Sequence, residues 1–149
     1  MTTMQSRLKD EMKQAMRDKE KSRLGTIRLI MAAIKQIEVD QRVVLDDEQV
    51  IATLDKMLKQ RRESIRQYRD AGREDLAEVE EAEIAVIQDF LPQALTEEEI
   101  TAMVETAIAD CSASSIKDMG KVMALLKPAM LGRADMSVVG KKIKTALGV

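Results

Sequence analysis

The sequence contains no histidine and almost no aromatic side chains, which removes several common kinds of functional site. Tyr68 and Phe90 are the only aromatic residues among the 149, and neither of the usual glycine-rich phosphate loops is present. Without histidine, the chain lacks the commonest general base and the commonest metal ligand. Without aromatic platforms, it cannot read unpaired bases by stacking. We therefore expect no self-sufficient catalysis, no metal site and no cofactor.

Cysteine and long apolar runs are also scarce. Cys111 is the single cysteine, so an internal disulfide is impossible, and the chain has no histidine to activate its thiol. No apolar stretch approaches the roughly 20 residues that a membrane span requires. The first 21 residues lack the apolar core of a signal peptide. We predict a cytoplasmic protein that does not enter a membrane.

What the sequence does contain is helical periodicity along almost its whole length. Apolar residues recur at spacings of three and four, and alternating strand patterns are nearly absent. The fold class predicted is all-α, a helical bundle. The expected helices cover residues 3–18, 20–38, 46–71, 73–90, 97–110, 116–127 and 136–147.

Two breaks divide this helical pattern. The short turn at Gly72 predicts that the third and fourth helices form a long antiparallel hairpin. Pro92 stops the fourth helix, and Thr96 with Glu99 forms a capping box that starts the fifth. We therefore expect an N-terminal helical subdomain over 1–92 and a small three-helix C-terminal subdomain over 96–149.

Charge is distributed in three blocks. Residues 1–73 contain 17 Lys/Arg and 12 Asp/Glu, residues 74–110 contain 12 Asp/Glu and no Lys/Arg, and residues 111–149 contain 7 Lys/Arg and 2 Asp. A strongly acidic segment therefore separates two basic ones.

The third helix carries a basic stripe at spacings of three, four and three. It is either a solvated face neutralised by the acidic fourth helix or a surface that contacts phosphates. The stripe consists of Lys59, Arg62, Arg66 and Arg69.

Arg61 points by helical phase into the apolar side of the same helix, where it needs a carboxylate partner. Glu80 and Glu83 lie on one side of the fourth helix, at heights similar to Arg61 across the Gly72 turn. Paired carboxylates can hold a metal or do acid–base work, but no histidine accompanies them. We interpret these three residues as structural.

The last 39 residues collect basic side chains around the sequence Gly-Arg-Ala-Asp at 132–135. Gly132 permits a turn with positive φ and Asp135 can cap the last helix, which leaves the arginine unexplained. The basic residues are either ordinary solubilising charges or one assembled phosphate-binding patch. They are Lys117, Lys121, Lys127, Arg133, Lys141, Lys142 and Lys144.

Three segments together resemble the YqeY branch of the GatB/YqeY family, over nearly the whole chain. They are LIMAAIKQIEVDQR at 29–42, KQRRESIRQYRDAGREDLAEVEEAEIAVIQDFLPQALTEEEI at 59–100 and KDMGKVMALLKPAMLGRAD at 117–135. The resemblance implies two helical parts, the second similar to the tail domain of the GatB subunit of tRNA-dependent amidotransferases. In that enzyme the tail engages the body of the tRNA, while amidation occurs in other domains that have no counterpart here.

The leading hypothesis is a tRNA-binding or tRNA-associated module, linked to translation and without its own catalysis. A first alternative is an accessory or component of glutamine-dependent amidotransfer to aminoacyl-tRNA, a carbon–nitrogen ligase reaction. A second is a protein-interaction module. The expected partners are thus tRNA and, under the first alternative, aminoacyl-tRNA or the amidotransferase machinery.

Overall fold

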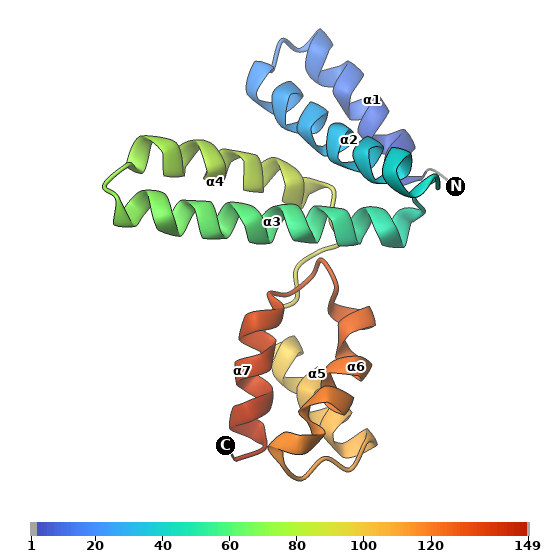
Figure 1. Ribbon diagram of the computed structural model, residues 1–149, viewed down its shortest axis with the longest axis vertical. Helices are drawn as coiled ribbons and strands as arrows, with labels where there is room; N and C mark the ends of the chain where they lie inside the picture. Colours follow the sequence, from blue (N-terminus) through green and yellow to red (C-terminus); the bar gives the residue numbers. More distant parts are fainter. Residues whose placement is uncertain (1–2, 149) are drawn as a thin grey trace. The chain divides into compact units, whose positions relative to one another are not determined.

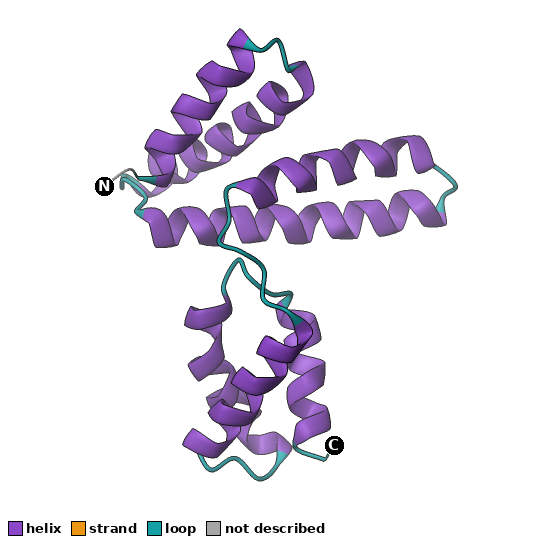
Figure 2. Cartoon of the chain, turned by 180° about the vertical axis from the view of Figure 1, so that it is seen from behind, coloured by secondary structure: helices purple, strands orange, loops and turns teal. Residues whose placement is uncertain are grey.

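The computed structural model describes residues 3–148, and every regular element in that range is a helix (Figures 1 and 2). The prediction of an all-α protein is confirmed. None of these helices is both long and apolar enough to cross a membrane. The elements are α1 (Met4–Arg17), α2 (Lys21–Gln41), α3 (Asp47–Asp70), α4 (Glu74–Asp89), α5 (Glu97–Asp110), the 3₁₀ turn η1 (Ile116–Asp118), α6 (Met119–Met130) and α7 (Met136–Ala146).

The chain divides into two compact units, Met1–Leu91 and Pro92–Val149. Each unit has its own cluster of buried apolar side chains. Because burial of apolar surface is the main force that stabilises a fold, each cluster marks a separate centre of stability.

The first unit contains α1 to α4. Asp46 and Gln49 form a reciprocal capping box that starts α3, and Gly72 with φ of +73° follows its end. α3 and α4 lie side by side, joined by residues 71–73, and α1 packs on α2 (Figure 1). The core of this unit consists of Leu8, Ala15, Ile27, Ile30, Ile34, Leu45, Val50, Leu54, Met57, Leu58, Ile87 and Phe90.

The end of α4 is fastened to α1 and α2 by two arginines. The guanidinium groups of Arg7 and Arg23 lie 4.9 Å and 5.6 Å from the centre of the buried Phe90 ring. Arg7 also donates to the Asp89 carbonyl, and Arg23 pairs with the Asp89 and Glu11 carboxylates. Phe90 is thus the point at which three helices of this unit meet.

The second unit contains α5, α6 and α7. The side chain of Thr96 accepts from the Glu99 amide, and that of Glu99 accepts from the Thr96 amide, as in a capping box. α7 is capped by Asp135, which accepts from the Ser137 amide. The core consists of Ile100, Val104, Ala107, Val122, Leu126, Met130, Met136, Val139 and Ile143.

α6 differs from the helix expected over 116–127. It opens with the 3₁₀ turn and then continues through Pro128 to Met130. Proline removes one backbone donor and crowds the preceding turn, which predicts a stop at 127. Met130 is fully buried, and its carbonyl accepts from the amides of Arg133 and Ala134 in the turn that follows the helix.

Candidate nucleic-acid interface

The lysines of α7 point in two directions. Side chains turn by about 100° per residue along a helix. Lys141 and Lys144 therefore share one flank of α7, and Lys142 lies on the other. The Lys142 ammonium donates to the Thr101 hydroxyl of α5 over 3.5 Å, so its flank faces α5. The structure thus keeps Lys141 and Lys144 together, both exposed, and separates Lys142 from them.

Lys127 lies near the end of α6 and is exposed, whereas Lys117 and Lys121 lie at its beginning. Lys117 belongs to the 3₁₀ turn and Lys121 to the α-helix, so the two do not follow a single helical period. Lys121 lies 3.9 Å from the Asp118 carboxylate. The basic residues of this segment therefore form small exposed groups on α6 and α7.

The two aspartates of residues 111–148 are both occupied by backbone amides. The Asp118 carboxylate accepts from the Ser114 and Ser115 amides, and these bonds lower the pKa of Asp118. Asp135 accepts from the Ser137 amide. Both carboxylates are thus engaged by backbone donors. Apart from Lys121, no basic residue of this segment forms an ion pair with either aspartate among the described residues.

Arg133 makes a structural contact that the sequence did not reveal. Its Nε donates to the Gln93 carbonyl over 3.0 Å, and its own carbonyl accepts from the Leu95 amide over 2.9 Å. These two bonds fasten the segment before α5 to the turn between α6 and α7. Gly132, with φ of +74°, shapes that turn.

The basic stripe of α3 is largely paired with carboxylates. Lys59 lies 3.3 Å from Asp55, and Arg66 pairs with Glu63. Arg69 bonds to Glu74 over 3.2 Å and also to Glu81 of α4. Only Arg62 of these four has no ion pair among the described residues. This pattern favours the interpretation of the stripe as a neutralised face.

Arg61 lies between α3 and α4 with its side chain 14% exposed. Its Nε is 2.8 Å from Glu83 Oε2 and 3.8 Å from Glu80 Oε2. Burial and the neighbouring Glu83 charge raise the pKa of Glu80, against the attraction of Arg61. The three residues therefore form one charged cluster, and within residues 3–148 no group of three or more potential ligands is arranged for a metal ion.

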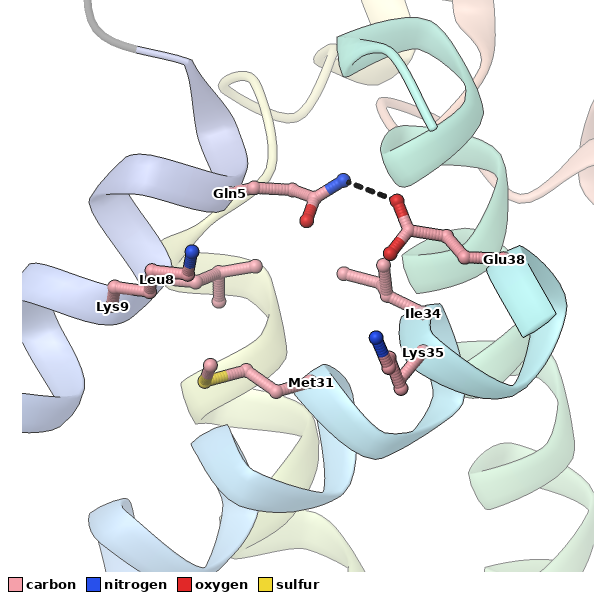
Figure 3. Close-up of a pocket in the computed structure, with 7 residues that line it drawn as sticks. All are labelled: Gln5, Leu8, Lys9, Met31, Ile34, Lys35 and Glu38. Atoms are coloured by element: carbon pink, nitrogen blue, oxygen red, sulfur yellow. Dashed lines mark hydrogen bonds between the residues drawn. The ribbon is translucent and has the colours of Figure 1, made fainter. Parts of the chain in front are cut away.

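A pocket of about 360 Å³ between α1 and α2 was not predicted, since no motif marks it (Figure 3). Leu8, Met31 and Ile34 give it an apolar floor, and Gln5 and Glu38 meet over 3.0 Å at its edge. Glu38 also accepts from the Leu45 amide, and these two bonds lower the pKa of Glu38. Gln5 and Glu38 thus hold the loop before α3 through hydrogen bonds to the backbone of Leu45.

Comparison with known proteins agrees with the resemblance seen in the sequence. The family model described as "Yqey-like protein" matches residues 5–147. A protein of Pyrenophora tritici-repentis (strain Pt-1C-BFP), "Altered inheritance of mitochondria protein 41, mitochondrial", is 34% identical over 145 residues, 95% of this chain and 80% of the relative.

A protein of the same name from Meyerozyma guilliermondii is 39% identical over 84 residues. That match covers 56% of this chain and 44% of the relative. The names of both relatives include the word mitochondrial, so the cytoplasmic location of this chain stays a prediction. The match of the family model over nearly the whole chain shows that the protein belongs to the YqeY-like family.

Proposed function

We propose that this protein binds tRNA through the exposed basic residues of α6 and α7 and that it has no catalysis of its own. The observation that carries the proposal is the charge of residues 111–148. This segment has seven basic side chains and only two carboxylates, and both carboxylates accept from backbone amides. Such a surface attracts phosphates without reading bases.

The composition of the chain supports recognition by backbone and shape. The two aromatic residues both lie in the first unit, so α6 and α7 offer no platform for stacking bases. A folded RNA presents closely spaced phosphates whatever its sequence. The resemblance of the C-terminal part to the GatB tail, which engages the tRNA body, supports tRNA as the ligand.

The proposed contact is confined to α6 and α7 of the second unit. α5 carries five carboxylates and no basic residue, so it would repel phosphates. Lys117, Lys121, Lys127, Lys141 and Lys144 are the exposed candidates, whereas Arg133 contributes through its fold-stabilising bond to Gln93. The α3 stripe adds little, because most of its charges are paired.

The test compares tRNA affinity for the wild type and for Lys141→Glu/Lys144→Glu across a range of salt concentrations. We expect the double variant to bind more weakly and the slope of log K against log salt to fall by about two, one for each phosphate that is no longer neutralised. The matched control is Lys13→Glu/Lys56→Glu, which makes the same charge change in the first unit. Equal weakening in both variants would show general charge repulsion rather than a binding face.

The amidotransfer alternative is separated by a second assay. The purified protein is given mischarged tRNA, glutamine and ATP, and amidated product is measured. We expect none, since no nucleophile–base pair is apparent in the sequence. Product formed by the protein alone would replace the binding-module proposal with an enzyme.

A further inference from the structure

A second feature lies in the first unit, away from the basic residues of α6 and α7. A groove of about 620 Å³ runs between α2 and α4, and we refer to it as the α2–α4 groove. One stripe of α2 and one stripe of α4 form its walls, because the lining residues recur at spacings of three and four on each helix. Its lining residues include Lys21, Gly25, Thr26 and Leu29 from α2 with Glu78, Val79 and Ala82 from α4.

The floor of this groove includes a glycine that the protein's own packing does not require. Gly25 lies inside α2 with ordinary helical backbone, and a Cβ built there meets no atom within 4 Å. A glycine inside a helix makes that helix less stable than an alanine would. Room for the close approach of another molecule would account for it.

Two large apolar side chains flank the groove in exposed positions. Leu29 is 47% exposed and Val79 is 57% exposed. Small residues between larger apolar ones make a surface into which the ridge of a helix fits. An amphipathic helix buries such anchors at spacings of three, four and seven residues along one face.

The charge of α4 indicates which kind of molecule could bind in the α2–α4 groove. Between Glu74 and Asp89 the helix has seven carboxylates and no basic residue. Six of these carboxylates pair with four arginines, Arg23, Arg61, Arg69 and Arg73, so α4 keeps an excess of three negative charges. Asp75, Glu78 and Glu83 line the groove together with Lys21, and Glu78 forms no ion pair among the described residues. This wall would repel nucleic acid and attract lysine or arginine side chains.

We propose that the α2–α4 groove docks an amphipathic helix of a partner protein, with small or apolar residues facing Gly25 and basic residues along the α4 side. The carboxylates of α4 orient the incoming helix, and the apolar side chains of Leu29 and Val79 bury against it. This proposal is independent of tRNA binding, because every residue it uses lies in α2 and α4.

The experiment selects binders to the full-length protein from a displayed library of helical peptides with an apolar face and randomised flanks. The best peptide is then titrated by fluorescence anisotropy. We expect enrichment of Lys and Arg on one flank and a Kd at least tenfold weaker for both Gly25→Gln and Glu78→Lys. Gly120→Gln and Glu105→Lys make the same changes at exposed positions in the second unit and should leave the Kd within twofold.

Three results would overturn the proposal. One is the absence of any helical binder, and another is a set of binders whose affinity is unchanged by Gly25→Gln and Glu78→Lys. The third is a concentration-dependent dimer in sedimentation that Gly25→Gln abolishes, because the occupant would then be a second copy of the chain. Circular dichroism of each variant checks its fold, and Glu78→Lys, at an exposed position, tests the groove even if Gly25→Gln unfolds.

Discussion

Arg61 of α3 pairs with two glutamates of α4, and its side chain is more buried than those of Arg23 and Arg69, which also pair with two carboxylates each. The Arg61 side chain is 14% exposed and that of Glu83 is 22% exposed. Removing one partner of a buried pair strands the other charge in a poorly hydrated site.

We expect Arg61→Ala to lower the free energy of unfolding by about 2 kcal/mol, between the values for exposed and for fully buried pairs. Arg62→Ala, at the exposed neighbour, should change it by less than about 0.5 kcal/mol. Urea unfolding of both variants gives the comparison. Equal midpoints for the two would mean that water replaces the Arg61 contacts at no cost in stability.

The contribution of Glu80 to the stability of the folded state depends on pH, and its sign is opposite to that of most carboxylates. Burial raises its pKa above the ordinary 4.5, so the folded state holds the proton more tightly than the unfolded state. The stabilisation that this gives is present below the unfolded pKa and is lost as pH rises through the folded pKa.

For Glu80→Gln, which cannot ionise, we expect the urea midpoint relative to the wild type to increase as pH rises from about 4 to about 7. A double variant that also carries Arg61→Met controls for the neighbouring guanidinium. If the relative midpoint instead falls over this range, attraction to Arg61 outweighs the cost of burying the carboxylate.

At the scale of helices, most boundaries follow from local chemistry that the sequence displays. The capping boxes at Asp46 and Thr96 and the turn at Gly72 are formed by residues within a few positions of each other. The end of α6 departs from the sequence prediction because the burial of Met130, a tertiary effect, outweighs the local effect of Pro128.

Substitutions at two glycines of the first unit can separate the effect of backbone conformation on stability from the effect of packing. A Cβ at Gly25 or at Gly72 would meet no atom within 4 Å, but only Gly72 has positive φ. Alanine at Gly25 should therefore raise the free energy of unfolding by about 1 kcal/mol, since it suits a helix better.

Alanine at Gly72 should lower that free energy by about 1 kcal/mol or more, because its Cβ is strained at positive φ. Thermal unfolding of both variants at one pH measures the contrast. If both substitutions changed the free energy of unfolding in the same direction, the backbone conformation of one of these glycines would be contradicted.

At the scale of the whole molecule, the candidate site shows what a sequence pattern can and cannot predict. Helical phase alone groups Lys141 with Lys144, and this follows from their spacing. The contact of Lys142 with Thr101 and that of Arg133 with Gln93 each join residues about 40 positions apart. Neither could be read from local spacing, because they depend on how α5, α6 and α7 pack.

The existence of two separate apolar cores leads us to expect that the second unit folds alone. A unit of this size is close to the lower limit for independent stability. Small contributions should therefore decide whether a fragment folds. The bonds of Arg133 to Gln93 and Leu95 are such contributions, and both partners precede α5.

We predict that a fragment covering 92–149 is helical by circular dichroism and that one covering 96–149 is less stable by about 1–2 kcal/mol, because it lacks two hydrogen bonds. Arg133→Ala in the longer fragment removes the side-chain bond alone and should lie between them, whereas Lys141→Ala should have no effect. Limited proteolysis of the full chain should cut between the two units, near residues 92–96, before it cuts within helices. If both fragments are coil, the second unit depends on the first, and 92–96 is not a boundary between independently folding parts.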